Sequence, residues 1–560
     1  MKKICGFLGV AALMALASCA NDKLDGPDNG QQVQDGEVSY VNVILSLSGL
    51  DTKADGDDYK YGTKEESEIK TLVLAFYDAS GNLLEAKELT GDGTDGTHTS
   101  TSQNVAVEKE ITTIEVKDFT KNYSASIVAY VNIPASEVQN KSLSAMKAIK
   151  NVSDLQNTTD KSFKMTNSGY YDNSNNYVME VPVSVSNFYK KGDSSARAVE
   201  IYVERLAAKA TVAELKGIQA YKVIEGENTE VELTFVPQTW FVQNLESESY
   251  LLKNMPPTKS STYETNFASW FNRANDHRCF WAQSAGYSSR NLTKNDYTTQ
   301  DGSFSAKSGE DGTYESVFSL SNGAANNGKY LHENTFASTT DWADVTSIII
   351  VGKYKIHRDA SEIYDDETFY LRDSYIIDNG EAKAVQKIYN EEGVKKALFS
   401  SVTGIKKGNE ALTTNSVKLK HVSDNVYVLE LEDKEGEDYV IDGVEGKSYA
   451  DVNAELAKII PAYKYHEGKA YFAVPLKNYD SSSTNTKRIE LAAAKEGNYG
   501  IVRNRWYELT VNSIKGLGTG ISGEEDDKDE PEPSDDPDVY VIDATLKVLQ
   551  WHSAGQTVDL

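Results

Sequence analysis

Two groups of residues have types and spacing that could do chemistry. Gly518, Gly520 and Gly523 follow the G-x-G-x-x-G pattern that cradles a pyrophosphate, but an acidic run follows them instead of the helix that such a site needs. His277 and Cys279 could contribute to a zinc site, which needs three or four ligands, yet the seven histidines are scattered along the chain. Aspartate-rich turns lack the complete spacing of an EF-hand loop. The sequence also has no P-loop and no nucleophile elbow. We therefore expect that the protein is not an enzyme and has no metal site and no cofactor.

A cysteine near the N-terminus could carry a covalent lipid. Lys2 and Lys3 precede a short apolar run that ends at Leu16, which is typical of a secretory signal and too short for a good membrane-spanning helix. Leu16, two small residues and Cys19 resemble the lipobox of bacterial lipoproteins. That resemblance implies removal of residues 1–18 and diacylation of Cys19, so we expect an exported precursor held at a membrane by lipid. An ordinary signal with an incidental cysteine is the alternative.

Composition narrows the class of protein. The formal net charge of −28 argues against binding to nucleic acid, whose phosphates would be repelled. Tyrosine is abundant, at 33 residues, which favours sheets over helical bundles. Of the three cysteines, Cys5 lies in the signal and Cys19 would carry lipid, so only Cys279 stays in the folded body and an intrachain disulfide is excluded. The 560 residues allow two or three domains, each with a core of its own.

The first predicted strand is followed by a loop that carries a lysine. Apolar residues recur in it at every second position, as in a strand with one buried face. They are Val41, Val43, Leu45 and Leu47. An exposed turn follows, and the bond between Lys53 and Ala54 in this turn is a place where proteolytic nicking would be easy.

The last segment, residues 539–560, contains a second strand with this periodicity. Its candidate residues are Ile542, Ala544, Leu546, Val548, Leu549 and Trp551. The first four alternate with polar residues, whereas the last two have the opposite parity, so we expect a bulge or a change of contact surface near Gln550. An acidic run with prolines precedes the strand and is too polar to fold alone. A strand on such a tether either folds back on its own body or completes the sheet of another molecule.

Between these two strands the sequence predicts mainly β-structure. Short apolar segments separated by polar turns favour β-sandwiches over alternating βα units. Only residues 391–398 and 449–459 have a helical pattern, apart from one or two short turns within 135–155. Aromatic rings could stack on sugars, but packing within the sheets explains most tryptophans better. The tryptophans are Trp240, Trp270, Trp281, Trp342, Trp506 and Trp551.

Several longer segments carry a resemblance to a known family. In chain order they are FYDASGNLLEAKEL (76–89), AYVNIP (129–134), YVERLAAKATV (202–212), TWFVQNLESESYLLKN (239–254), RCFWAQSAGY (278–287), YLHENTF (330–336), YHEGKAYFAVPLKN (465–478) and GIVRNRWYELTVNSI (500–514). With the lipobox and the first strand, they make the chain similar to the type V fimbrillins of Bacteroidales-type bacteria, in particular to the Mfa-like, minor-type fimbrillins. The resemblance covers essentially the whole chain.

The resemblance implies a mainly β fold with two transthyretin-like β-sandwich domains and a C-terminal donor strand. The expected parts are a signal peptide (1–18), a lipidated propeptide with the removable first strand (19–53), an N-terminal sandwich (54–217), a C-terminal sandwich (218–521), an acidic linker (522–538) and the donor strand (539–560).

The resemblance also implies a function. The precursor would reach the outer membrane as a lipoprotein, and a trypsin-like, Arg- or Lys-directed protease would cut after Lys53, with Lys60, Lys64 or Lys70 as other positions. Subunits would then polymerise by donor-strand exchange into a surface fimbrium that supports adhesion and biofilm formation. The expected partners are further copies of the chain and the anchor and tip subunits of the fimbrium.

Two other classes of protein share some of these features. A lipid-anchored, glycan-binding surface protein would have the same export signal, acidity and aromatic content. A secreted glycosidase or protease would need a set of catalytic residues that the sequence does not show.

Overall fold

The computed structural model describes a large part of the chain. The described residues are 33–46, 59–90, 110–116, 126–172, 174–190, 198–215, 221–257, 279, 281–288, 297–298, 305–306, 328–339, 341–359, 363–364, 366–378, 381–423, 425–433, 438–477, 496–514, 516–523 and 542–552. They are mainly β, as predicted, with few and short helices. None of the helices in these ranges is long and apolar enough to cross a membrane.

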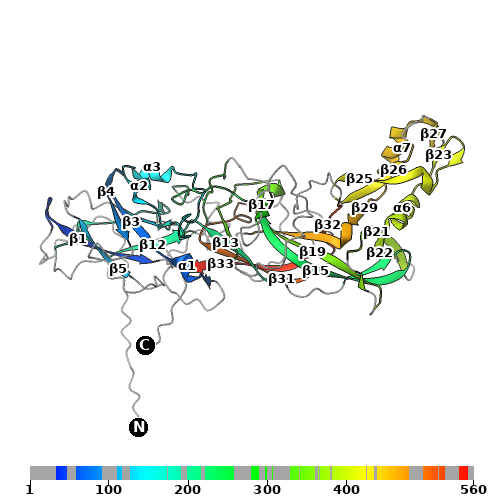
Figure 1. Ribbon diagram of the computed structural model, residues 1–560. Coiled ribbons are helices and arrows are strands. Elements are labelled where there is room, and N and C mark those ends of the chain that lie inside the picture. Colours follow the sequence, from blue (N-terminus) through cyan, green and yellow to red (C-terminus); the bar gives the residue numbers. More distant parts are fainter. Residues whose placement is uncertain are drawn as a thin grey trace, which may run out of the picture.

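The N-terminal sheet occupies one end of the molecule (Figure 1). Its strands follow the order β11-β1-β12-β7-β6-β3-β4, with β5 paired to β1 and β10 to β6. They are β1 (Ser39–Ser46), β3 (Thr71–Tyr77), β4 (Leu83–Thr90), β5 (Glu110–Val116), β6 (Ser126–Val131), β7 (Met165–Asn167), β10 (Val181–Pro182), β11 (Phe188–Tyr189) and β12 (Val199–Arg205). The short helices α2 (Ala135–Val138) and α3 (Leu143–Lys147), in the region where helical turns are predicted, lie along one side of this sheet (Figure 1).

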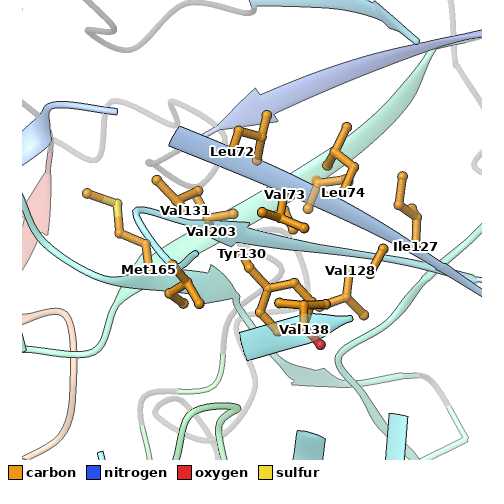
Figure 2. Close-up of a cluster of buried hydrophobic side chains, with 14 of the residues drawn as sticks. Leu72, Val73, Leu74, Ile127, Val128, Tyr130, Val131, Val138, Met165 and Val203 are labelled. Atoms are coloured by element: carbon orange, nitrogen blue, oxygen red, sulfur yellow. The ribbon is translucent and has the colours of Figure 1, made fainter. Parts of the chain in front are cut away.

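The core of this end forms around β3 and β6. Both strands are nearly continuous apolar runs, and all but the first residue of each is buried, as expected for central strands covered on both faces. Figure 2 shows side chains from β3, β6, β7, β12 and α2 converging in one cluster. The buried hydroxyls of Tyr77 and Tyr130 satisfy each other at 3.1 Å.

A smaller sheet in the middle of the molecule combines segments from the start, middle and end of the chain. Its order is β18-β13-β31-β33-β2. The strands are β2 (Tyr59–Tyr61), β13 (Ala208–Leu215), β18 (Lys329–Leu331), β31 (Arg505–Ile514) and β33 (Ile542–His552). Only Leu206 and Ala207 separate β12 from β13, so one apolar stretch passes from the N-terminal sheet into this middle sheet.

The largest sheet follows the order β25-β26-β29-β21-β22-β14-β15-β19-β30-β32, with short strands β16, β17 and β20 at its side. Its strands are β14 (Tyr221–Glu225), β15 (Thr229–Gln243), β16 (Tyr297–Thr298), β17 (Ser305–Ala306), β19 (Ser347–His357), β20 (Ile363–Tyr364), β21 (Phe369–Asp378), β22 (Glu381–Tyr389), β25 (Val417–Ser423), β26 (Val426–Leu431), β29 (Ala462–Tyr465), β30 (Lys469–Pro475) and β32 (Thr519–Gly520). Aromatic side chains pack in its core, for example Phe235 edge-on to Phe472 at 5.2 Å between ring centroids.

Residues 390–461 form a distal module at the end of the molecule opposite the N-terminal sheet (Figure 1). It contains both longer helices that the sequence predicts, α6 (Glu391–Phe399) and α7 (Tyr449–Leu456). A small sheet of β23 (Ile405–Lys407), β24 (Glu410–Ala411), β27 (Tyr439–Ile441) and β28 (Val444–Lys447) completes it together with β25 and β26. The module has a core of its own.

The other short elements connect these parts. They are α1 (Lys64–Ser67), the pair β8 (Tyr170–Tyr171) and β9 (Tyr177–Val178), and the 3₁₀ turns η2 (Val185–Asn187), η3 (Trp342–Asp344), η4 (Thr414–Ser416) and η5 (His466–Gly468).

Candidate strand-exchange site

The first strand, β1, is paired along both of its edges. On one edge it runs antiparallel to β5, from Ser39 opposite Val116 to Leu45 opposite Glu110. On the other edge it pairs first with β11 and then runs parallel to β12, with Val43 opposite Val199. A strand in this position cannot leave without exposing the backbone donors and acceptors of β5 and β12.

The inner face of β1 carries the residues that the sequence predicts. Val41 and Val43 are fully buried, and Leu45 packs partly buried against the same core cluster. Leu47 lies outside the described residues. Upstream of the strand, Val33 is also buried in this cluster. The segment that contains β1 is therefore part of the hydrophobic core, and its removal would open a vacancy lined by apolar side chains.

The outer face of β1 makes polar contacts with its two neighbours. The Tyr40 hydroxyl donates to Glu115 on β5 at 3.3 Å, and the Tyr189 hydroxyl on β11 donates to the side-chain oxygen of Asn42 at 2.7 Å. The rings of Tyr40 and Tyr189 lie 6.0 Å apart. These contacts come from residues far along the chain, and nothing in the local sequence around β1 predicts them.

The C-terminal strand, β33, folds back on its own chain. It runs antiparallel to β31 from Ile542, opposite Ile514, to Gln550, opposite Arg505. Its last residues also run parallel to β2, where Trp551 pairs with Lys60. This is the intramolecular alternative that the sequence leaves open. All six candidate residues, Ile542, Ala544, Leu546, Val548, Leu549 and Trp551, belong to this one strand.

Of the two features expected near Gln550, a bulge is absent from the pairing with β31, but a change of contact surface is present. The register continues unbroken from Leu546 to Gln550, and the one shift on β31 lies between Val511 and Ser513. Pairing with β2 begins at Gln550 on the other edge. Pairing with β31 ends at the same residue, so the strand passes from one partner to the other at Gln550.

A buried ion pair anchors the chain directly after β2. Glu66 in α1 accepts hydrogen bonds from Lys209 Nζ and from the Tyr330 hydroxyl, both at 2.6 Å. Burial raises the pKa of Glu66, but the bonds from Lys209 and Tyr330 outweigh that effect, so its pKa is lowered. Lys209 also lies 4.0 Å from the ring centre of Trp506 on β31. α1 is therefore attached to the body independently of β1.

Arg205 adds to this anchor from β12. Its guanidinium donates to the Glu66 carbonyl oxygen at 2.7 Å and to Ser67 Oγ at 3.0 Å. Sequence reasoning missed this cluster, although a signal was present: Glu204, Arg205 and Lys209 are charged residues inside a long apolar stretch, where charges need buried partners.

Some of the predicted processing residues lie within the described part of the chain and others lie outside it. Cys19, Lys53 and Ala54 lie outside the described residues. The other candidate lysines lie within ordered elements: Lys60 in β2 and Lys64 at the first position of α1. Lys70 directly precedes β3, and its backbone N–H donates to the Asn132 side chain at 2.7 Å. Cleavage at these lysines would require local unfolding, since a protease needs an accessible segment.

The glycine pattern at residues 518–523 serves packing. A Cβ atom on Gly518 would lie 2.6 Å from the Tyr471 carbonyl oxygen, and one on Gly520 would lie 2.3 Å from that of Lys464. These glycines therefore allow β32 to approach the neighbouring backbone closely. Among the residues that the structure describes, no three histidine, cysteine, aspartate or glutamate side chains could hold a metal ion together.

Four tryptophans are buried, namely Trp240, Trp281, Trp342 and Trp506. Trp270 lies outside the described residues, and Trp551 belongs to β33. The four buried rings are packed inside the protein and offer no exposed face for a sugar, as the packing interpretation of the sequence predicts.

The C-terminal part of the chain matches a known family. Residues 463–557 match the family model described as the C-terminal part of fimbrillin, the major fimbrial subunit protein type IV. Over this region the chain is similar to the fimbrillins. The match includes both β31 and β33, and it confirms the fimbrillin resemblance of the sequence motifs. It supports a structural role in a fimbrium at the cell surface.

Solved structures that are similar to this chain share little sequence with it. They include a putative cell adhesion protein from Parabacteroides distasonis (13% identity, 93% of this chain and 99% of that chain covered, TM-score 0.39). Another is a fimbrial assembly protein from the same species (10% identity, 70% of this chain and 95% of that chain covered, TM-score 0.26). A third is the fimbrial anchor protein Mfa2 from Porphyromonas gingivalis (8% identity, 92% of this chain and 99% of that chain covered, TM-score 0.19). No curated protein matches the sequence.

Proposed function

We propose that this protein is a fimbrillin, a subunit of the fimbrial shaft that polymerises by donor-strand exchange. Cleavage after Lys53 removes residues 19–53, including β1, and β33 of a neighbouring subunit takes the vacated place. The observation that carries this proposal is the position of β1, which is paired on both edges and buries Val41 and Val43 in the core. An added strand is a common mode of recognition, because main-chain hydrogen bonds supply affinity and side-chain pockets supply specificity.

The dimensions of the two strands agree with an exchange. β33 has 11 residues and β1 has 8, so β33 is long enough to fill the whole place of β1. Each large apolar side chain that is buried contributes about 1.5–3 kcal/mol, and every backbone group left unpaired in the vacancy would add a cost. The acidic linker, residues 522–538, can span roughly 55 Å when extended, which is enough to reach a neighbouring subunit.

Two alternative states of β33 follow from this proposal. While β1 is in place, the vacancy does not exist and β33 pairs with its own β31 and β2. After cleavage, the same strand can leave that pairing and enter the vacancy of a neighbour.

Lipid on Cys19 keeps the precursor at the outer membrane until a trypsin-like protease releases it, so assembly is confined to the cell surface. Transthyretin-like domains, anchor and tip subunits, adhesion and biofilm formation belong to the same proposal.

Substitution of the lysine at the proposed cleavage site tests the proteolytic step. In Lys53→Ala we expect the uncleaved, lipidated precursor to accumulate as a monomer, because β1 continues to fill its place. The matched control is Lys60→Ala, which should be processed and should polymerise normally, since Lys60 lies in β2. Electron microscopy and gel electrophoresis without boiling would show fibres and oligomer ladders. Normal fibres from Lys53→Ala would refute cleavage at this bond.

Deletion of the C-terminal strand tests the donor separately. A chain without residues 539–560 should be processed and folded but should form no polymer. β31 then presents a free edge, so solubility is measured beside the oligomer ladder. An unchanged ladder after this deletion would contradict the donor role of β33.

A further inference from the structure

We infer the register of the exchange, which rests on the proposed function. The structure points to β33 entering in the direction of β1, with Ile542 at the place of Val41 and Asp543 at the place of Asn42. Leu546 then takes the place of Leu45. The Tyr189 hydroxyl favours this register, because only in this alignment can it donate a hydrogen bond to the Asp543 carboxylate.

Parity restricts the possible registers. The places of Val41 and Val43 are fully buried, so no charged residue can occupy them at reasonable cost. Asp543 and Lys547 of the donor must therefore lie on the outer, half-exposed face, where β1 carries Tyr40, Asn42 and Ile44. Registers that place Asp543 on this face differ by steps of two residues.

Charges on the neighbouring strands separate the three remaining registers. At the place of Tyr40, Asp543 would stand directly opposite Glu115 of β5. At the place of Ile44, it would pair with Glu200 of β12. Like charges directly opposite each other destabilise a sheet. At the place of Asn42, Asp543 stands opposite Thr113, which is uncharged.

The Tyr189 hydroxyl adds an attraction to the same register. In the precursor it donates to the Asn42 side-chain oxygen at 2.7 Å. Aspartate has the length and shape of asparagine, so the Asp543 carboxylate can accept this bond in the same position. A hydrogen bond to a charged acceptor is stronger than one to a neutral amide. The hydroxyl that holds the resident strand would therefore hold the incoming strand more firmly.

The ends of the strand agree with this alignment. The apolar side chains follow in the same order, with a β-branched residue first and leucine four positions later, in Val41 and Leu45 as in Ile542 and Leu546. Lys547 comes to the place of Ser46, which pairs with Tyr202 two residues beyond Glu200. A reversed strand would have to rebuild both ladders, because β1 is parallel to β12 and antiparallel to β5.

Disulfide trapping reads the register directly. Thr545→Cys, which keeps Asp543 and both glutamates, is combined in the precursor with one cysteine, at Ile111 or Thr113 of β5 or at Tyr202 of β12, and each double variant is processed and allowed to assemble under mild oxidation. In the inferred register Thr545 takes the place of Ile44, opposite Ile111. With Asp543 at the place of Tyr40 it would stand opposite Thr113, and with Asp543 at the place of Ile44 it would pair with Tyr202. Residues opposite each other in adjacent strands lie within the Cα distance of a disulfide. We expect covalent oligomers on boiled, non-reducing gels from Thr545→Cys with Ile111→Cys only.

The possible outcomes separate the register from the proposed function. Fibres with the main cross-link in the Thr113 or Tyr202 variant would overturn the register and leave donor-strand exchange standing. Fibres without any cross-link would also overturn it, since the strand would then be reversed or shifted further. No fibres from any variant or from the processed wild type would contradict the proposed function itself.

A tyrosine pair tests the role of the hydroxyl. Capture of a peptide of residues 539–560 is measured with processed protein that lacks its own residues 539–560. Tyr189→Phe should weaken capture about tenfold, the usual effect of losing a hydrogen bond to a charged group. Tyr40→Phe should leave it unchanged, because Tyr40 departs with the propeptide. With an Asp543→Asn peptide, the effect of Tyr189→Phe should shrink, and an undiminished effect would contradict a Tyr189–Asp543 contact.

Discussion

His332 shows how a single side chain links pH to the stability of the fold. It directly follows β18, and its ring nitrogens lie 2.9 Å from Ser249 Oγ and 3.1 Å from the Ser153 carbonyl oxygen. Burial disfavours the charged ring and lowers the pKa of His332 to about 4. Between pH 6.5 and 4 the unfolded chain therefore binds a proton here that the folded protein does not bind.

We expect this histidine to weaken the fold in acid. Its contribution is complete above pH 6.5 and is lost as the pH falls towards 4, because the unfolded chain gains the proton first. The loss should be about 2 kcal/mol, reduced from the full effect by the partial exposure of the ring. Urea unfolding followed by tryptophan fluorescence at several pH values would measure it. His332→Gln should have a flatter dependence than wild type, and an equally steep dependence in this variant would contradict the role of His332.

The burial of residues that follow a regular local pattern could be predicted from the sequence. The contacts of residues whose partners lie far away in the chain could not. The burial of Val41 and Val43 follows from their period of two. The contact of Tyr189 with Asn42 joins residues 147 positions apart, and that of Lys209 with Glu66 joins residues 143 apart. Such pairs depend on the order of strands in the sheet, which periodicity does not determine.

At the level of elements, β33 is a strand with two possible partners, and its sequence is compatible with both. In the folded-back pairing, Lys547 stands opposite Glu508 of β31. Opposite charges in this position stabilise a strand pair by roughly 0.2–1 kcal/mol. Charge therefore favours the folded-back pairing only modestly. A vacated place of β1 that buries more apolar surface of β33 can outweigh this preference. The strand and its alternation could be predicted, but the choice between the two partners could not, because both β31 and the place of β1 include buried apolar residues.

A charge reversal should loosen the folded-back pairing in the unprocessed precursor. Glu508→Lys and Lys547→Glu each place like charges opposite each other, so each should destabilise the pairing by roughly 0.2–1 kcal/mol. The double variant restores an opposite pair and should recover the wild-type value. Hydrogen exchange of the β33 amides measures the opening free energy in all four proteins. Equal exchange in all four would show that β33 is not paired with β31 in the precursor.

At the scale of the whole molecule, a buried ion pair joins the N-terminal sheet to the segment that follows β15. Lys253 in this segment contacts Glu204 of β12 at 3.0 Å, and both side chains are fully buried. A second fully buried pair, Arg503 with Glu333 at 2.6 Å, joins two segments of the later part of the chain. Removing one partner from such a pair is costly, so each pair holds its two segments in a fixed arrangement. The mainly β class and the two long helices were predictable from local patterns. The distal module as a separate body was not, since its strands β25 and β26 look like those of any sheet.

The position of this distal module predicts that it is dispensable for assembly. β21 lies between β22 and β29, with Tyr370 opposite Tyr389 on one side and opposite Lys464 on the other. Adjacent strands are about 4.8 Å apart, so the two chain ends of the module lie roughly 10 Å from each other and a linker of four glycine and serine residues can join them. Replacing residues 390–461 by this linker removes α6 and α7 but touches neither β1 nor β33. We expect this variant to be processed and to form fibres of smaller diameter, since the places of donor and acceptor are intact. The exposed edge of β29 and the uncovered ring of Tyr370 should lower its melting temperature, which circular dichroism would show. A folded, processed variant that forms no fibres would mean that the module takes part in contacts between subunits.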